Sequence, residues 1–165
     1  MKLGTTQQEQ HEYWMGLALR EAEIALRRGE VPVGAIVVYN GVIIAKGSNQ
    51  TEMLQDATAH AEMIALTAAA AHLGQKWLDN CTMYVTLEPC AMCAGALVLA
   101  RLPLLVFGAY DPKAGACTSL YSITTDPRLN HRVNSIGGIA VEKCGGILKG
   151  FFEGKRKMGG EASRR

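Results

Sequence analysis

The sequence contains no run of 18 or more apolar residues, the length expected of a transmembrane helix, so we expect no membrane span. Residues 1–12 are polar and lack the apolar core of a signal peptide, which predicts a cytoplasmic protein. The cysteines number five, and an odd number argues against a disulfide framework. With 165 residues, of which 48% are hydrophobic, the chain can bury a core. These limits predict one soluble domain over residues 1–165.

The net charge of +2 neither indicates nor excludes a nucleic-acid partner, but the basic residues are unevenly placed. Residues 149–165 contain six basic side chains and two acidic ones, and such an excess can contact phosphates. The alternative is a solvated, flexible basic tail over residues 158–165, which suits the two final arginines. Lys155, Arg156 and Lys157 lie closer to the folded part and are the better candidates for phosphate contacts.

Two short motifs supply one imidazole, two thiols and one carboxylate. The first is His60-Ala61-Glu62, and the second is Pro89-Cys90-Ala91-Met92-Cys93. Imidazole nitrogen and thiolate sulfur are ligands that zinc prefers, and three protein ligands leave the fourth position for water, as in catalytic sites. Cys90 and Cys93 are three residues apart, so both sulfurs lie on one face of a helix. The positive end of the helix dipole favours the thiolate form there.

Both motifs are predicted to open helices, with Thr58 as the N-cap of the first and Pro89 in the first turn of the second. Glu62 lies two residues from His60, about 200° around a regular helix, so we expect it to carry protons and not to bind metal. Taken singly, each motif has another interpretation: a redox pair, a packed histidine or a solvated glutamate. Together and in this order, they indicate a hydrolytic zinc site.

The order H-x-E and then P-C-x-x-C is the signature of zinc-dependent nucleobase deaminases. The sequence resembles this superfamily and, more narrowly, the bacterial tRNA-specific adenosine deaminases. The narrower resemblance rests on five stretches: residues 31–35, 56–66, 86–96, 107–116 and 129–133. The first three stretches are shared with other deaminases, whereas the last two point to the tRNA enzymes.

The resemblance implies that His60, Cys90 and Cys93 hold one Zn²⁺ per chain. It also implies that Glu62 moves protons while adenosine is hydrolysed to inosine at the wobble position of a tRNA anticodon. The implied partners are the anticodon stem-loop of a tRNA and a second copy of the chain, because the family acts as a homodimer in which both subunits contact the RNA.

Further residues are implied to contact the substrate. Asn49 would hydrogen-bond the target base, although a loop asparagine is otherwise a common turn residue. Backbone groups near Ala61 would shape the base pocket, and Asp111 would contact the nucleotides that flank the target. For Lys113 and Asn130 we predict RNA contact, with ordinary surface charge and a satisfied turn as the respective alternatives.

Two other functions use the same motifs. A deaminase of a free base or nucleotide, such as guanine or cytosine, would need the same metal and proton carrier. Only the stretches Asp111–Lys113 and Asn130–Arg132 and the basic tail argue against it. A non-catalytic, zinc-stabilised RNA-binding subunit would need no free carboxylate, so Glu62 argues against that function.

The remaining pattern predicts an α/β fold. An amphipathic helix over residues 8–28 ends before Gly29, and Asn40-Gly41 predicts a hairpin between two strands. Strands are expected at residues 33–39, 42–46, 83–86, 104–107 and 132–136. Their alternation with helices implies parallel pairing and a three-layer α/β/α sandwich around a mixed central sheet of about five strands, the cytidine deaminase-like architecture that the resemblance also implies.

Two segments are harder to assign. Residues 108–133 are weakly periodic, and so long an irregular stretch is uncommon in a compact domain unless it is functional. A final helix is expected over residues 141–157, but four glycines interrupt it at about 1 kcal/mol each relative to alanine. Of Phe151 and Phe152, we expect at least one to pack inward.

Overall fold

The structure is a computed structural model that describes residues 6–162. Its strands are β1 (Gly34–Tyr39), β2 (Val42–Ser48), β3 (Cys81–Leu87), β4 (Leu104–Ala109) and β5 (Asn134–Ile136). Its helices are α1 (Gln7–Arg27), α2 (Thr51–Leu54), α3 (Ala61–Leu73), α4 (Ala91–Leu99) and α5 (Val141–Ala162), with a 3-10 turn η1 at Ile123–Thr125. Over the described residues, no helix combines the length and the apolar character that crossing a membrane requires.

The five strands form one mixed sheet in the order β2-β1-β3-β4-β5. Strand β1 pairs antiparallel with β2 and with β3, whereas β4 pairs parallel with β3 and with β5. The predicted mixed sheet of five strands is therefore confirmed, with parallel pairing confined to β3, β4 and β5. The predicted hairpin is confirmed as well, because Asn40 and Gly41 have φ values of 50° and 73°, both in the left-handed region that a type I′ turn requires.

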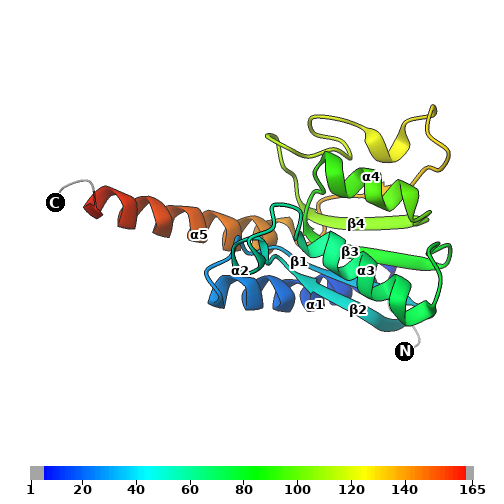
Figure 1. The fold of residues 1–165 in the computed structure, drawn as a ribbon, viewed down its shortest axis with the longest axis horizontal. Helices are drawn as coiled ribbons and strands as arrows, with labels where there is room; N and C mark the ends of the chain where they lie inside the picture. Colours follow the sequence, from blue (N-terminus) through cyan, green and yellow to red (C-terminus); the bar gives the residue numbers. More distant parts are fainter. Residues whose placement is uncertain (1–5, 163–165) are drawn as a thin grey trace.

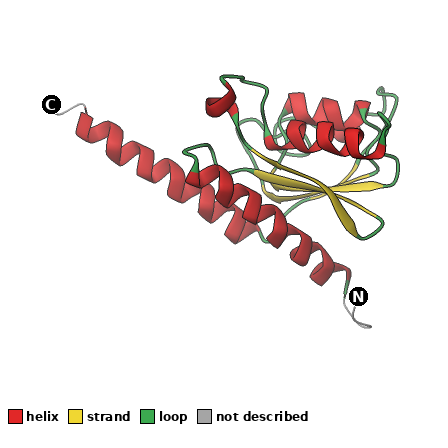
Figure 2. Ribbon diagram, turned by 60° about the horizontal axis from the view of Figure 1, so that its bottom comes forward, coloured by secondary structure: helices red, strands yellow, loops and turns green. Residues whose placement is uncertain are grey.

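Helices cover both faces of the sheet, as the three-layer prediction requires. Helices α3 and α4 lie on one face, and α1 and α5 lie on the other (Figures 1 and 2). Each face has its own apolar core, and neighbouring residues of β1 serve both: Ala35 and Val37 belong to one core, Ile36 and Val38 to the other. Because successive side chains of a strand point to opposite faces, a strand buried on both faces must be apolar throughout.

The helix starts differ from the prediction in a way that matters for the site. Thr58 does not cap α3: its hydroxyl donates to Asp56 Oδ1 at 2.7 Å, and the N-cap residue is His60. Cys90 is the N-cap residue of α4, so Pro89 precedes the helix and does not lie in its first turn. The segment between the second predicted strand and His60 contains the end of β2 and the short helix α2.

Helix α5 runs unbroken through its glycines to Ala162. A Cβ added at Gly145, Gly146, Gly150 or Gly154 would meet no atom within 4 Å, so these glycines lower helix propensity without serving a close contact. The prediction that Phe151 or Phe152 packs inward is wrong. Phe152 is 47% exposed and Phe151 is half-buried, neither joins an apolar core, and the two rings pack against each other.

The first five residues of the predicted basic tail, 158–162, continue α5. Residues 163–165, with the two final arginines, lie outside the described residues.

Candidate active site

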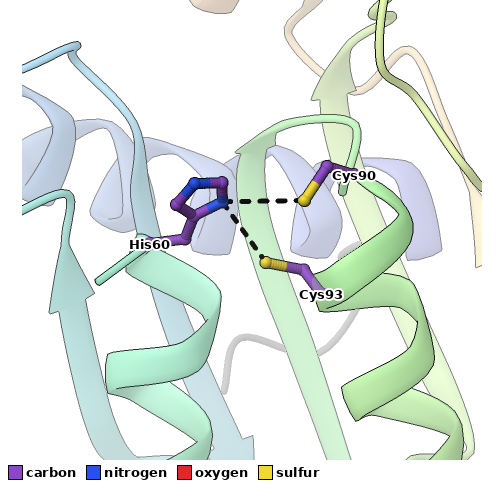
Figure 3. Close-up of side chains that lie close together, drawn as sticks. All are labelled: His60, Cys90 and Cys93. Carbon is purple, nitrogen blue, oxygen red and sulfur yellow. Dashed lines mark hydrogen bonds between the residues drawn. The ribbon is translucent and has the colours of Figure 1, made fainter. Parts of the chain in front are cut away.

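His60, Cys90 and Cys93 converge between the starts of α3 and α4 (Figure 3). His60 Nδ1 lies 3.6 Å from Cys90 Sγ and 3.5 Å from Cys93 Sγ, and the three donor atoms lie within 4.8 Å of one another. The topology brings them together: β2 and β3 both run antiparallel to β1, so the helices that follow them start at the same edge of the sheet. The three predicted metal ligands therefore form one cluster that could hold a metal ion.

The sulfurs of the cluster differ in protonation. Hydrogen bonds from Cys93 and from His60 lower the pKa of Cys90 to about 3, so this side chain is a thiolate. The hydrogen bond to Cys90 and burial both raise the pKa of Cys93. The cluster thus already holds one anionic sulfur beside a second thiol, and thiolate is the form in which cysteine binds metal.

Glu62 faces the same pocket although it lies only two residues from His60. Because His60 is the N-cap, with an extended backbone (φ −72°, ψ 153°), the 200° separation expected within a regular helix does not apply. Glu62 is 4% exposed, and burial raises its pKa to about 7. A carboxyl group with a pKa near neutrality can both accept and donate a proton.

A cavity of about 220 Å³ opens at these side chains. The other lining residues include Asn49, Ala61, Leu87, Glu88, Asp111 and Ala114. Three of the predicted substrate-binding residues, Asn49, Ala61 and Asp111, therefore line the same space as His60, Cys90 and Glu62.

A larger groove of about 820 Å³ adjoins this cavity and shares Asp111 with it. Lys113, Lys155 and Arg156 line the groove together with aromatic side chains from the loop after β4 and from α5. Asn130 is not among the residues that line either space: it is exposed in the segment between η1 and β5. The structure therefore groups every predicted substrate-binding residue except Asn130.

Two buried glutamates were not assigned roles from the sequence. Glu88 is 2% exposed and accepts hydrogen bonds from the loop that contains Asp111. Burial alone would raise its pKa, but hydrogen bonds from Ser119, Thr118 and Asp111 outweigh burial and lower the pKa to about 2. Glu30 is fully buried and accepts the backbone N–H groups of Glu52 and Met53. Glutamate is usually exposed, so neither residue by itself indicates burial. Only the apolar residues beside each glutamate in the sequence could have indicated it.

Comparisons with known proteins agree with this geometry. Residues 9–156 match the family described as MafB19-like deaminase. The chain is 47% identical over 148 residues to the tRNA-specific adenosine deaminase of Bacillus subtilis, covering 90% of this chain and 92% of the relative. It is 48% identical over 142 residues to that of Aquifex aeolicus, covering 86% and 93%. A solved structure from a study of A-to-I editing by tRNA A34 deaminases at the wobble position superposes with a TM-score of 0.80 at 43% identity, covering 82% of this chain and 99% of that one.

Proposed function

The chain belongs to the family of tRNA-specific adenosine deaminases, and on that premise we propose that it hydrolyses adenosine to inosine at the wobble position of a tRNA anticodon. One observation carries the proposal: a cluster of three potential metal donors, two of which line one small cavity, lies beside a buried carboxylate that lines the same cavity and has a pKa near 7.

We propose that His60, Cys90 and Cys93 hold one Zn²⁺ per chain. One imidazole and two sulfurs suit this ion, and the three donor atoms are close enough to share it. Within residues 6–162, no fourth histidine, cysteine or carboxylate joins the cluster, which leaves one position of a tetrahedral site for water. When bound, the ion would lower the pKa of that water and make it a nucleophile.

Glu62 would carry the proton through the reaction. It would accept a proton from the attacking water and deliver it to the ring nitrogen of adenine, then accept the second proton from the hydroxyl added at C6 and deliver it to the departing amine. The water oxygen bonds to C6, the bond between C6 and the exocyclic nitrogen breaks, and ammonia leaves. Burial supports this role, because a pKa of about 7 lets Glu62 act in both directions.

The base must leave its stack to enter the cavity, which is easier from a single-stranded anticodon loop than from a duplex. Asn49, buried at the cavity, would hydrogen-bond the base, and the backbone at Ala61 would pack beside it. Asp111, which borders both the cavity and the groove, would contact the flanking nucleotides.

The groove would bind the RNA backbone. Lys113, Lys155 and Arg156 offer cations for phosphates, and Phe152 and Tyr110 offer aromatic faces for unpaired bases. These features favour an RNA substrate over a free base, which would need neither. Asn130 lies outside the groove, and its contact with RNA stays a prediction.

We further propose a homodimer that forms through the surface at α4. Leu99 on this helix is 80% exposed, and Leu120 and Tyr121 are exposed as well, in the loop between β4 and η1, where η1 contacts α4. Exposed apolar side chains that gather in one region often mark an interface. A cytoplasmic location would place the protein with its tRNA substrate.

The test uses an anticodon stem-loop RNA with adenosine at the wobble position, in which inosine is read as guanosine after reverse transcription. Glu62→Ala should retain about one zinc per chain and lose roughly 10²–10⁴ in rate, because only proton transfer is removed. Glu23→Ala, which removes an exposed glutamate of α1, is the matched control and should keep full activity.

Near-normal turnover by Glu62→Ala would contradict the proposed role of Glu62. Ammonia release from free guanine or cytosine, with no inosine in the RNA, would favour a free-base deaminase. Zinc-loaded protein that binds the RNA and never forms inosine would favour a non-catalytic subunit.

A further inference from the structure

The buried carboxylate of Glu88 binds a loop that forms the outer wall of the cavity. Its Oε1 accepts the backbone N–H groups of Cys117, Thr118 and Ser119 at 3.1, 2.8 and 2.9 Å. Its Oε2 accepts the N–H of Asp111 at 3.1 Å and the hydroxyl of Ser119. Among the described residues, no lysine, arginine or histidine pairs with Glu88, so N–H and O–H dipoles of this one loop satisfy its charge.

The loop backbone lies directly on the motif that carries the metal donors. Gly115 forms an antiparallel bridge with Cys90, and the N–H of Ala116 donates to the carbonyl of Pro89 at 2.8 Å. A Cβ at Gly115 would lie 2.6 Å from the carbonyl oxygen of Asp111 and closer still to the Glu88 carboxylate. Only glycine permits so close an approach.

The same loop bears the side chains that face the substrate. Asp111 and Ala114 line the cavity, and Lys113 lines the groove. The donor atoms, in contrast, are fixed by the starts of α3 and α4. A change at Glu88 should therefore move the outer wall and leave the donors in place.

We propose that Glu88 is a positioning residue for the RNA: it ties the loop Asp111–Ser119 to the metal-binding motif and so presents Asp111 and Lys113 to the substrate. The RNA part of this inference rests on the proposed function, whereas the tying of the loop rests on the hydrogen bonds alone. Glu88 also lines the cavity, but in the role proposed here it acts through the loop and not on the base or the reacting atoms.

Glu88→Gln separates this role from catalysis. In this variant an amide NH2 group replaces one carboxylate oxygen. It fits best at the Oε2 position, because there the Ser119 hydroxyl can rotate and accept a hydrogen bond from it. The Asp111 N–H, which can only donate, loses its acceptor. Amide exchange at Asp111 should then accelerate by about 10- to 100-fold, the factor for loss of one charge-assisted hydrogen bond. KM for the stem-loop RNA should rise about tenfold, with kcat within about threefold and zinc still near one per chain.

Gly115→Ala perturbs the same contact from the loop side without changing charge, and Ser119→Ala removes one donor. They test the proposal independently should Glu88→Gln fail to fold. If Glu88 and Gly115 act through one contact, the double variant should raise KM by little more than the larger single effect. Gly16→Ala is the control: no atom lies within 4 Å of its added Cβ, and KM should not change.

Unchanged exchange at Asp111 in Glu88→Gln, or additive effects in the double variant, would overturn the proposal. So would loss of zinc in Glu88→Gln, because Glu88 would then support the donors. If exchange accelerates and RNA binding weakens in a protein that never forms inosine, the deaminase function fails and the positioning role stands. If exchange accelerates while RNA affinity and KM stay unchanged, the positioning role fails.

Discussion

A methyl group at Gly47 would collide with the first turn of α3, the helix whose N-cap residue is His60. A Cβ there would lie 2.9 Å from the nitrogen of Ala65, 3.1 Å from the carbonyl carbon of Ala61, and closer still to the Ala61 oxygen. Ordinary contacts of a Cβ start near 3.4 Å. All three atoms are backbone, so no side chain can turn away, and the helix or the strand must move by about 1 Å.

The expected cost has two parts. Overpacking of this kind typically destabilises a protein by about 1–3 kcal/mol. Ala61 lies between His60 and Glu62, so a shift of this turn displaces the proposed metal donor and the proposed proton carrier together. A misplacement of about 1 Å can cost roughly 100-fold in rate. We therefore expect Gly47→Ala to lose both stability and about 100-fold in inosine formation.

Gly34→Ala provides the matched control. Its Cβ would lie 2.7 Å from the carbonyl carbon of Glu21 and closer to backbone atoms of Ala18 and Ala22, so it displaces α1 on the opposite face of the sheet. The free energy of unfolding in urea should fall by a similar amount, about 1–3 kcal/mol, but kcat should stay within about threefold. Equal losses of activity in both variants would show that activity falls because stability falls, and not because the site is displaced. Full activity in Gly47→Ala would refute the reasoning.

Two further outcomes follow from charge and burial. Replacing Lys155 and Arg156 by glutamine should make the slope of log affinity for RNA against log salt concentration shallower, by about 0.7 for each phosphate that the protein no longer neutralises. Fluorescence anisotropy of the labelled RNA measures this slope, and the control Arg20→Gln on α1 should leave it unchanged. Burial raises the pKa of Tyr84 to about 12. The folded state therefore favours the neutral phenol, and its stabilising contribution is complete below about pH 10 and is lost as pH rises through 12. Between pH 8 and 12, the free energy of unfolding in urea should fall by up to about 2 kcal/mol less in Tyr84→Phe than in the unmodified protein. An unchanged pH dependence would contradict this prediction.

The sequence predicted the parts of the molecule that local chemistry determines. Donor type and the three-residue spacing of Cys90 and Cys93 were enough to identify the cluster, and Asn40-Gly41 was enough to place the hairpin. The helix cap at Thr58 was wrong because Asp56 competes for its hydroxyl. Asn130 was grouped with Asp111 because both lie in one weakly periodic stretch, but their places depend on the path of that stretch, which no short-range pattern encodes.

That path depends on buried carboxylates, which explains why the sequence could not reveal it. An irregular segment has N–H groups that neither a helix nor a sheet pairs, and burying them requires acceptors from elsewhere. A carboxylate accepts several such bonds at once. Glu88 does so for the loop after β4, and Glu30 does so for α2 on the other side of the cavity, through the N–H groups of Glu52 and Met53 at 3.1 and 2.7 Å. The side chains proposed to hold the metal are thus fixed by regular structure, while the walls proposed to meet the substrate are fixed by buried carboxylates. Loops held in this way can change their sequence, and with it the RNA that they accept, without moving the donors.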